Sequence, residues 1–231
     1  MNNKLIVALD VDTMTEAERL LDLLLPEVKI FKVGIRLFTA CGPKIVKMIS
    51  SRGAKVFLDL KFCDIPNVVS RAIESAAGLG VFMLTVHILG SRRMLTESMK
   101  AVRSIARAQR PLVIGVTVLT SFNQDSLREI GIEKPLIDEV LSLALIAKQE
   151  GLDGVVCSPR EVAPIRRQFK KDFIIVTPGI RPVGSQKDDQ QRTMTPKQAR
   201  EEGVDYMVVG RPIIASPDPQ KSARRILTEI C

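Results

Sequence analysis

The segment from residue 55 to 67 carries an apolar run into three charged residues, Asp59, Lys61 and Asp64. Side chains of a strand alternate between its two faces, so Asp59 and Lys61 are expected to share one face. Asp64 falls just beyond the strand, which Pro66 cannot continue. An ammonium group held between carboxylates stays charged, because each negative charge favours its protonated form. Lys61 is therefore expected to act as a proton donor and not as a nucleophile.

Two further charged residues are expected near this lysine. Asp10 ends the first apolar run of the chain, and Lys32 lies in the second. In a barrel of parallel strands, the working groups lie at the C-terminal ends of the strands. Asp10, Lys32, Asp59 and Lys61 are therefore predicted to form an alternating network of carboxylates and ammonium groups, here called the charged network.

A second set of residues indicates a phosphate site. The segments Pro178-Gly179-Ile180-Arg181 and Gly210-Arg211-Pro212-Ile213 follow the seventh and eighth apolar runs, where barrels commonly bind phosphate. Glycine lets backbone N–H groups approach an anion, and arginine offers a bidentate fork. Residues 181–195 form a long polar stretch between the two segments, and we expect a lid loop there.

The elements that must position these residues recur regularly along the chain. Eight apolar runs are predicted to be strands: 5–10, 30–34, 56–61, 82–87, 112–119, 154–158, 173–179 and 206–211. Eight helical patterns alternate with them: 15–25, 43–51, 67–77, 91–108, 136–149, 160–169, 196–202 and 219–230. Eight alternations predict an α/β protein, a (β/α)8 TIM barrel formed as a single domain by residues 1–231.

Two local features refine this scheme. Thr15, followed three residues later by Glu18, is expected to cap the first helix. Residues 121–135, after the fifth strand, are expected to hold a short extra helix.

Composition narrows the classes of partner. A formal net charge of +8 is compatible with anionic ligands, but only 4% of the residues are aromatic, which leaves little for stacking nucleic-acid bases. The basic clusters at residues 166–171 and 221–225 are expected to be solvated outer faces of helices. No apolar run reaches the length of a membrane span and no signal peptide is evident, so we expect a cytoplasmic protein without nucleic-acid or membrane partners.

The four cysteines, Cys41, Cys63, Cys157 and Cys231, are scattered and have no metal-ligand spacing. They are expected to be reduced packing residues. Cys63 lies within the charged motif, but it should be out of phase with Lys61, so a catalytic role is not favoured.

The motifs together resemble the orotidine 5′-phosphate decarboxylase family, and the bacterial form is the closer match. The resemblance covers nearly the whole chain and is carried by Asp59-x-Lys61-x-x-Asp64-Ile65-Pro66-Asn67, Thr177-Pro178-Gly179-Ile180-Arg181-Pro182, Asp189-Gln190 and Gly210-Arg211-Pro212. It implies decarboxylation of orotidine 5′-phosphate to uridine 5′-phosphate (UMP) and CO2, the last step of de novo pyrimidine biosynthesis. It also implies that no metal and no organic cofactor takes part.

The resemblance assigns catalytic roles to Lys61, Asp59, Asp64 and Lys32. Lys61 matches the lysine that protonates C6 of the pyrimidine, and Asp59 matches the carboxylate beside the scissile group. Asp64 matches an aspartate lent across a homodimer interface to the neighbouring subunit's site.

The same resemblance assigns the substrate contacts. Asp10 and Lys32 match residues at the ribose hydroxyls, and Asp59 also contacts the substrate. Ile65 and Thr120 match further substrate contacts, with Thr120 on the pyrimidine side. The phosphate grip is implied for four residues, with Gln190 on the lid: Arg181, Gln190, Gly210 and Arg211.

Three departures from the family pattern concern affinity more than reaction class. Val68 stands where the family commonly has threonine, Cys63 where bacterial relatives often have histidine, and residues 86–91 replace a segment richer in glycine. The alternative function is a metal-dependent 3-keto-gulonate-phosphate decarboxylase or hexulose-phosphate synthase of the same superfamily. Those enzymes need an acidic metal ligand near the second strand, where this chain has Lys32.

Overall fold

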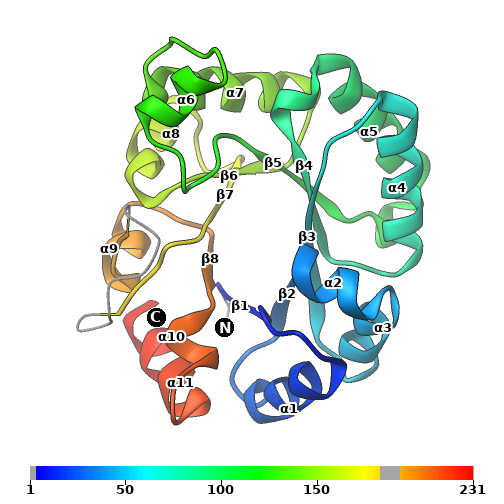
Figure 1. Ribbon diagram of the computed structural model, residues 1–231, viewed down its shortest axis with the longest axis vertical. Coiled ribbons are helices and arrows are strands. Elements are labelled where there is room, and N and C mark those ends of the chain that lie inside the picture. Colours follow the sequence, from blue (N-terminus) through cyan, green and yellow to red (C-terminus); the bar gives the residue numbers. More distant parts are fainter. Residues whose placement is uncertain (1–3, 183–192, 231) are drawn as a thin grey trace.

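The computed structural model describes residues 4–182 and 193–230, and it shows a closed barrel of parallel strands (Figure 1). The strands follow one another around the barrel in chain order, and the eighth pairs with the first. They are β1 (Leu5–Ala8), β2 (Ile30–Gly34), β3 (Lys55–Phe62), β4 (Met83–His87), β5 (Leu112–Val116), β6 (Gly154–Val156), β7 (Ile174–Thr177) and β8 (Tyr206–Val209). The predicted (β/α)8 fold is confirmed.

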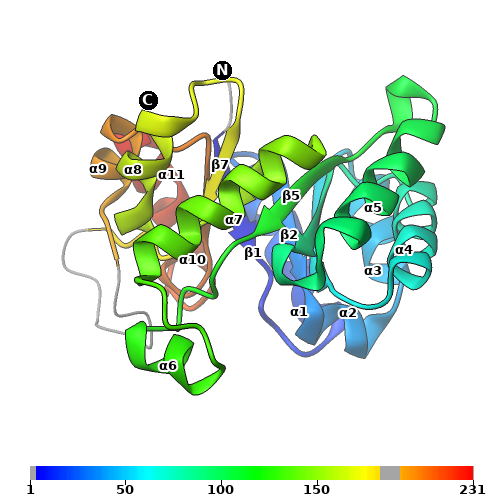
Figure 2. The same cartoon turned by 90° about the horizontal axis from the view of Figure 1, so that it is seen from above.

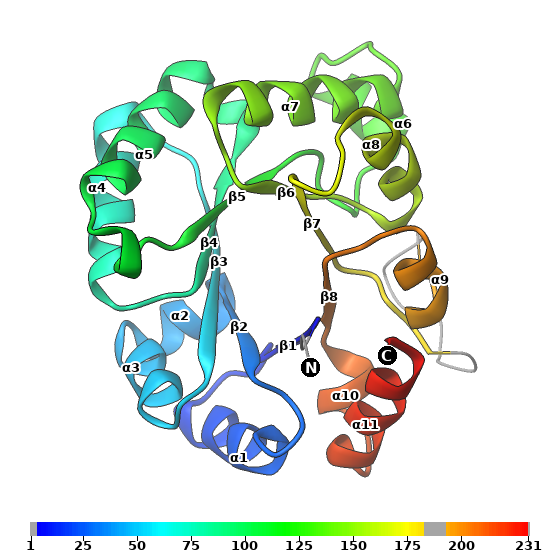
Figure 3. The ribbon, with the colours of Figure 1, turned by 180° about the vertical axis from the view of Figure 1, so that it is seen from behind.

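Helices surround this barrel, and α11 packs beside α1 to complete the outer ring (Figure 3). The helices are α1 (Met14–Leu24), α2 (Ile35–Cys41), α3 (Lys44–Ser51), α4 (Pro66–Gly78), α5 (Arg92–Ser104), α6 (Gln124–Glu129), α7 (Leu136–Glu150), α8 (Val162–Gln168), α9 (Pro196–Glu201), α10 (Arg211–Ile214) and α11 (Pro219–Ile230). Three short 3₁₀ turns join them: η1 (Ile88–Gly90), η2 (Arg107–Gln109) and η3 (Pro159–Glu161). Within the described ranges, none of these helices is long and apolar enough to cross a membrane.

Alternation along the strands divides the core into two layers. One face of β3 places Val56 and Leu58 in the large cluster between strands and helices. The other face places Phe57 in a smaller cluster inside the barrel. Ile6, Ile30 and five other buried side chains complete that inner cluster, so the barrel interior is filled and not hollow.

Several strands end earlier than the apolar runs predicted. β1 ends at Ala8, β5 at Val116 and β8 at Val209, so Asp10, Thr120 and Arg211 lie beyond their strands. Arg211 is instead the first residue of α10. The last apolar residues of the fifth run, Val118 and Leu119, line a cavity in place of continuing the sheet.

The helices also show one correction and one confirmation. Thr13, not Thr15, caps α1, because its hydroxyl accepts a hydrogen bond from the Glu16 N–H at 3.2 Å. Thr13 and Glu16 have the same spacing as Thr15 and Glu18, so spacing alone does not decide which threonine caps the helix. The short helix expected after the fifth strand is α6, which Figure 2 shows at one end of the barrel, beyond α7.

Candidate active site

The inner faces of β1, β2 and β3 change from apolar to charged near the C-terminal ends of the strands, within one inward-facing position of one another. Ile6 and Ala8 are followed on the inner face by Asp10, Ile30 is followed by Lys32, and Phe57 is followed by Asp59. Ala8 pairs with Lys32, and Gly34 pairs with Asp59. In this register Lys32 is level with Ala8 and Phe57, and its long side chain reaches Asp10 and Asp59 at the next inward-facing position, so the charged groups meet in one layer on top of the apolar interior.

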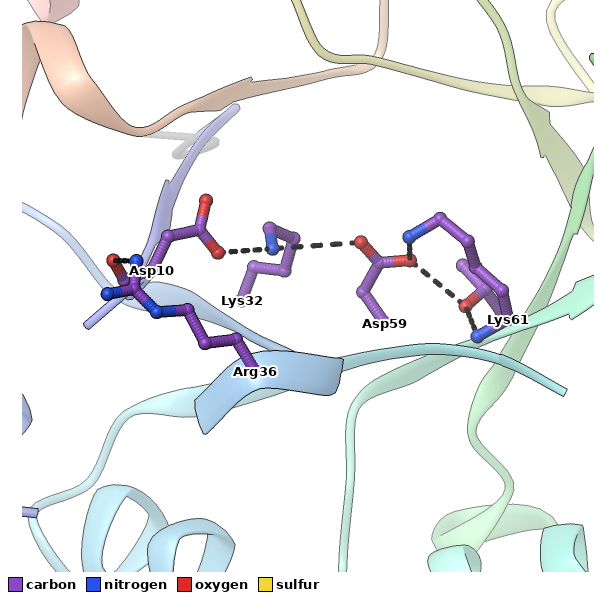
Figure 4. Close-up of polar contacts among 6 residues, drawn as sticks. Asp10, Lys32, Arg36, Asp59 and Lys61 are labelled. Atoms are coloured by element: carbon purple, nitrogen blue, oxygen red, sulfur yellow. Dashed lines mark hydrogen bonds and ion pairs between the residues drawn. The ribbon is translucent and has the colours of Figure 1, made fainter. Parts of the chain in front are cut away.

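The charged residues of this layer contact one another in the predicted alternating order (Figure 4). The Lys32 ammonium donates to Asp10 Oδ1 at 2.9 Å and lies 3.7 Å from Asp59 Oδ2. The Lys61 ammonium donates to the other oxygen, Asp59 Oδ1, at 3.0 Å. The side chains of Lys32 and Asp59 are only 11% and 13% exposed, so each needs its partner to offset the loss of hydration.

A bulge in β3 gives Lys61 its position. From Phe57 to Phe62, β3 advances five residues, while the paired residues of β4 advance only three, from Met83 to Val86. Extra residues of this kind bend a strand and re-aim its side chains. Lys61 has a φ of 51°, in the left-handed region that non-glycine residues rarely occupy. The bulge thus keeps Lys61 beside Asp59 at the rim of the barrel.

The charged network lines a cavity of about 250 Å³. Eight of the predicted site residues border it: Asp10, Lys32, Asp59, Lys61, Thr120, Arg181, Gly210 and Arg211. Apolar side chains form much of the remaining wall, among them Phe57, Val116 and Val176. Apolar walls lower the local dielectric and strengthen the interaction of the charged groups with a ligand.

The part of the wall that follows β7 and β8 has the features of an anion site. Gly179 has a φ of 79°, a conformation that glycine adopts without strain. The two ends of the polar stretch are held together, because Arg181 N–H donates to the Met194 carbonyl at 2.9 Å and Met194 N–H to that of Gly179 at 3.2 Å. Arg181 and Arg211 reach the cavity from these segments.

Two of the predicted residues that the structure describes stand outside this cavity. Asp64 and Ile65 are exposed, and Asp64 Oδ1 accepts only the N–H of Ile65, at 2.6 Å. Across the described part of the chain, Asp64 forms no ion pair with Lys61, so Asp59 alone is that lysine's carboxylate partner within one chain. Gln190 and most of the expected lid, residues 183–192, lie outside the described residues.

His87 and Cys63 lie near Lys61 without lining the cavity. Burial lowers the pKa of His87, and the positive charge of Lys61 lowers it further, so the imidazole is held neutral. Cys63 is an exposed free thiol, Cys41 is a partly buried free thiol, and Cys157 is a buried cysteine outside any disulfide. Cys231 lies outside the described residues.

Sequence reasoning missed three residues that support the charged network. The Thr85 hydroxyl donates to Asp59 Oδ1 at 3.1 Å, and an Arg36 Nη donates to the Asp10 carbonyl at 3.1 Å. Gly34 leaves room for Lys32, whose Nζ would lie 2.8 Å from a Cβ placed there. A threonine in an apolar strand reads as an ordinary strand former. Thr85 could have been found from its place on the inward-facing side of the strand, two residues before His87.

The basic clusters are mostly exposed, as expected, with one exception. Arg166 is wrongly predicted as a solvated residue, because its guanidinium is largely buried against Asp205 and three backbone carbonyls. These contacts lie before β7 and β8, at the end of the barrel away from the cavity. A nucleic acid could bind the Arg166 guanidinium only by breaking these intramolecular contacts.

A closed (β/α)8 barrel whose strand ends combine a charged network with two arginines defines the class: a barrel enzyme built for an anionic small-molecule substrate. Outside the masked segments, no cluster of three or more His, Cys, Asp or Glu side chains could hold a metal ion.

Known proteins give the family. The sequence model of the protein family described as "Orotidine 5′-phosphate decarboxylase / HUMPS family" matches residues 3–226 of this chain. Proteins named orotidine 5′-phosphate decarboxylase are similar to nearly the whole chain: that of Moorella thermoacetica is 50% identical over 99% of this chain and 92% of its own length. That of Syntrophotalea carbinolica is 51% identical over 98% and 94%.

A solved structure agrees with the sequence relatives. The crystal structure of orotidine 5′-phosphate decarboxylase from Lactobacillus acidophilus has a TM-score of 0.88 and 39% identity, and the match covers 99% of both chains. The chain therefore belongs to the orotidine 5′-phosphate decarboxylase / HUMPS family, and the family resemblance of its motifs is confirmed.

Proposed function

We propose that this protein decarboxylates orotidine 5′-phosphate to UMP and CO2, the last step of de novo pyrimidine biosynthesis. The observation that carries the proposal is the unbroken chain of contacts from Asp10 through Lys32 and Asp59 to Lys61, on the wall of a cavity that also holds Arg181 and Arg211. The names of the full-length relatives support the same substrate. The protein acts as a one-domain cytoplasmic enzyme and needs no metal or organic cofactor.

In this reaction, the bond between C6 and the substrate carboxylate breaks, and its electron pair stays on C6. A proton from the Lys61 ammonium then forms the new C6–H bond, and the lysine regains a proton from solvent. A fixed cation next to C6 stabilises the developing negative charge before and during transfer. Asp59 holds that cation at 3.0 Å and lies beside the departing carboxylate, which it disfavours electrostatically.

The remaining cavity residues bind parts of the substrate that do not react. Asp10 and Lys32 contact the ribose hydroxyls, and Thr120 contacts the pyrimidine. Lys32 also serves catalysis, because its charge fixes Asp59 from the side away from Lys61. Binding energy from groups remote from the broken bond orients the ring at Lys61.

The phosphate group is proposed to lie at the segments after β7 and β8, where Arg181 and Arg211 supply positive charge and Gly210 allows close approach of the backbone. Gln190 adds a contact from the lid formed by residues 181–195. The hydrogen bonds that join Arg181 to Met194 fix the base of this loop beside Gly179.

We further propose a homodimer in which Asp64 and Ile65 complete the partner's site. Both residues are exposed and follow β3 at the rim of the barrel. Exposed apolar side chains follow the neighbouring strands: Ile35 after β2 is 67% exposed, Ile65 is 66% exposed, and Val68 and Leu89 are each 46% exposed. Apolar groups gathered at one rim are typical of a surface that a second chain covers.

A metal-dependent decarboxylase or synthase of the same superfamily is the alternative. Lys32 weighs against it, because its ammonium lies 2.9 Å from Asp10 and 3.7 Å from Asp59, where a divalent cation would compete for the same carboxylates. The two functions separate in an absorbance assay with purified protein, orotidine 5′-phosphate and EDTA throughout. We expect full turnover with the chelator. Strict dependence on added Mg²⁺, or no turnover at all, would refute the proposed function.

A further inference from the structure

The left-handed backbone conformation of Lys61 is intrinsically unfavourable for a lysine, so neighbouring groups must stabilise it. A non-glycine residue at φ 51° is strained and persists only where its surroundings enforce it. The bulge between β3 and β4 breaks the regular ladder at this point, so the N–H of Lys61 needs another acceptor.

That acceptor is the hydroxyl of Thr85 on β4. The Lys61 N–H donates to Thr85 Oγ1 at 2.9 Å. The same hydroxyl donates its single hydrogen to Asp59 Oδ1 at 3.1 Å, the oxygen that also accepts from the Lys61 ammonium. Thr85 is completely buried, so water does not substitute for these two bonds.

We propose that Thr85 is a positioning residue for the proton-transfer step: one hydroxyl holds the Lys61 backbone in its strained conformation and fixes the carboxylate that aims the Lys61 ammonium. This inference deepens the proposed function and rests on it. Thr85 is not a catalytic residue, because it does not line the cavity. It acts through Asp59 and Lys61.

The geometry explains why a hydroxyl is needed at this place. Asp59 Oδ2 faces Lys32, while Oδ1 receives both Lys61 and Thr85, so the carboxylate is fixed from three directions. A valine would fill the same volume but would leave the Lys61 N–H buried without an acceptor. Lys61 would then relax from its left-handed φ, and its ammonium would leave the position proposed for C6.

Three variants test this role. Thr85→Val removes the hydroxyl at constant volume, Thr85→Ala removes it without risk of overpacking, and Thr85→Ser keeps it. We expect the valine and alanine variants to lose about 10–100-fold in kcat with KM changed less than about threefold, because a displacement near 1 Å can cost this much. Thr85→Ser should recover kcat to within about threefold of wild type.

Thr117→Val is the matched control. Thr117 is also completely buried, and its hydroxyl donates to the Val156 carbonyl at 3.0 Å, but it does not line the cavity. It should lose a similar amount of thermal stability and keep wild-type kcat. Equal kcat losses in Thr117→Val and Thr85→Val, or unchanged kcat in folded Thr85→Val and Thr85→Ala, would overturn the proposal.

Crystal structures of the wild type and Thr85→Val test it without any substrate. We expect Lys61 in the variant to leave the positive-φ region, or its Nζ to move beyond 4 Å from Asp59. An unchanged Lys61 in the variant would refute the positioning role even if the protein acts on another substrate. A wild type without turnover of orotidine 5′-phosphate would refute the proposed function alone.

Discussion

At the residue scale, close packing around the charged groups decides where their charges lie. Lys32 reaches Asp10 and Asp59 only because Gly34, two residues further along β2, has no side chain. A Cβ at Gly34 would lie 2.8 Å from Lys32 Nζ and 3.5 Å from Asp10 Oδ1. The glycine is thus part of the support of the charged network although it has no functional group.

Gly34→Ala should therefore displace the Lys32 ammonium and weaken its hold on Asp59. We expect kcat/KM for orotidine 5′-phosphate to fall about 10–100-fold, with the melting temperature little changed. Gly78→Ala, at the end of α4, is the control, because a Cβ there meets nothing within 4 Å. Wild-type kcat/KM in Gly34→Ala would contradict this view of the glycine.

His87 predicts a pH dependence of stability. Burial, and then the charge of Lys61, lower its pKa below the usual value of 6.5, so the unfolded chain binds more protons in that range. The stabilisation is fully present above about pH 6.5 and is lost as the pH falls from there through the lowered pKa. Denaturant unfolding between pH 8 and 5 should show a smaller decline in His87→Asn than in wild type. Parallel declines would show that His87 does not contribute.

At the scale of elements, the two ends of the barrel have separate tasks. The charged network lies at the C-terminal ends of the strands. Near the N-terminal ends of β7 and β8, an ion pair and side-chain hydrogen bonds connect the strands to α8. Asp205, before β8, accepts the N–H of Ile175 at 2.8 Å and pairs with Arg166 of α8. Arg166 also donates to the carbonyls of Gly203 and Phe173, at 2.9 and 2.6 Å.

Arg166→Met should lower the free energy of unfolding by about 1–3 kcal/mol, because it leaves the backbone carbonyls without their side-chain donor and Asp205 without its ion-pair partner. Activity of the folded enzyme should not change, since these contacts lie away from the cavity. Arg167→Met, at an exposed neighbouring position, should change stability by less than about 0.5 kcal/mol. Equal effects in the two variants, measured by urea unfolding, would contradict the structural role of Arg166.

The periodicity of apolar residues predicted the strands well where a run was clearly alternating or continuously apolar. Asp59 and Lys61 share the inner face of β3, and the eight apolar runs are the eight strands. The ends of β1, β5 and β8 were predicted too late. The fifth run was predicted too long because its apolar residues Val118 and Leu119 line the cavity and do not extend the sheet. Thr85 was missed because its function depends on a bulge in another strand, which no local pattern of β4 records.

At the scale of the whole molecule, the proposed homodimer would complete each active site with Asp64 of the partner subunit. Lys61 forms an ion pair with Asp59, but Asp64 of the same chain forms no ion pair with Lys61. Asp64 is instead exposed, at a rim of the barrel that is rich in apolar side chains. A two-fold dimer would bring each Asp64 to the other subunit, since such an interface joins the same patch of both chains.

Mixing inactive Lys61→Ala and Asp64→Ala proteins should therefore restore activity. A hybrid dimer holds one site with both native residues, so random exchange should give about a quarter of wild-type turnover per subunit. Each variant alone should stay inactive at the same concentration. No recovery, with subunit exchange demonstrated by mass spectrometry, would contradict a shared site.

The proposed reaction depends above all on Lys61 as the proton donor, and kcat of Lys61→Ala tests this role most directly. Turnover of orotidine 5′-phosphate should fall at least about a thousandfold, because the variant loses both the proton and the cation at C6. The fold, checked by circular dichroism, should be intact, and Lys47→Ala at an exposed site on α3 should keep wild-type kcat. A folded Lys61→Ala enzyme with kcat within tenfold of wild type would contradict the role of Lys61 as the proton donor.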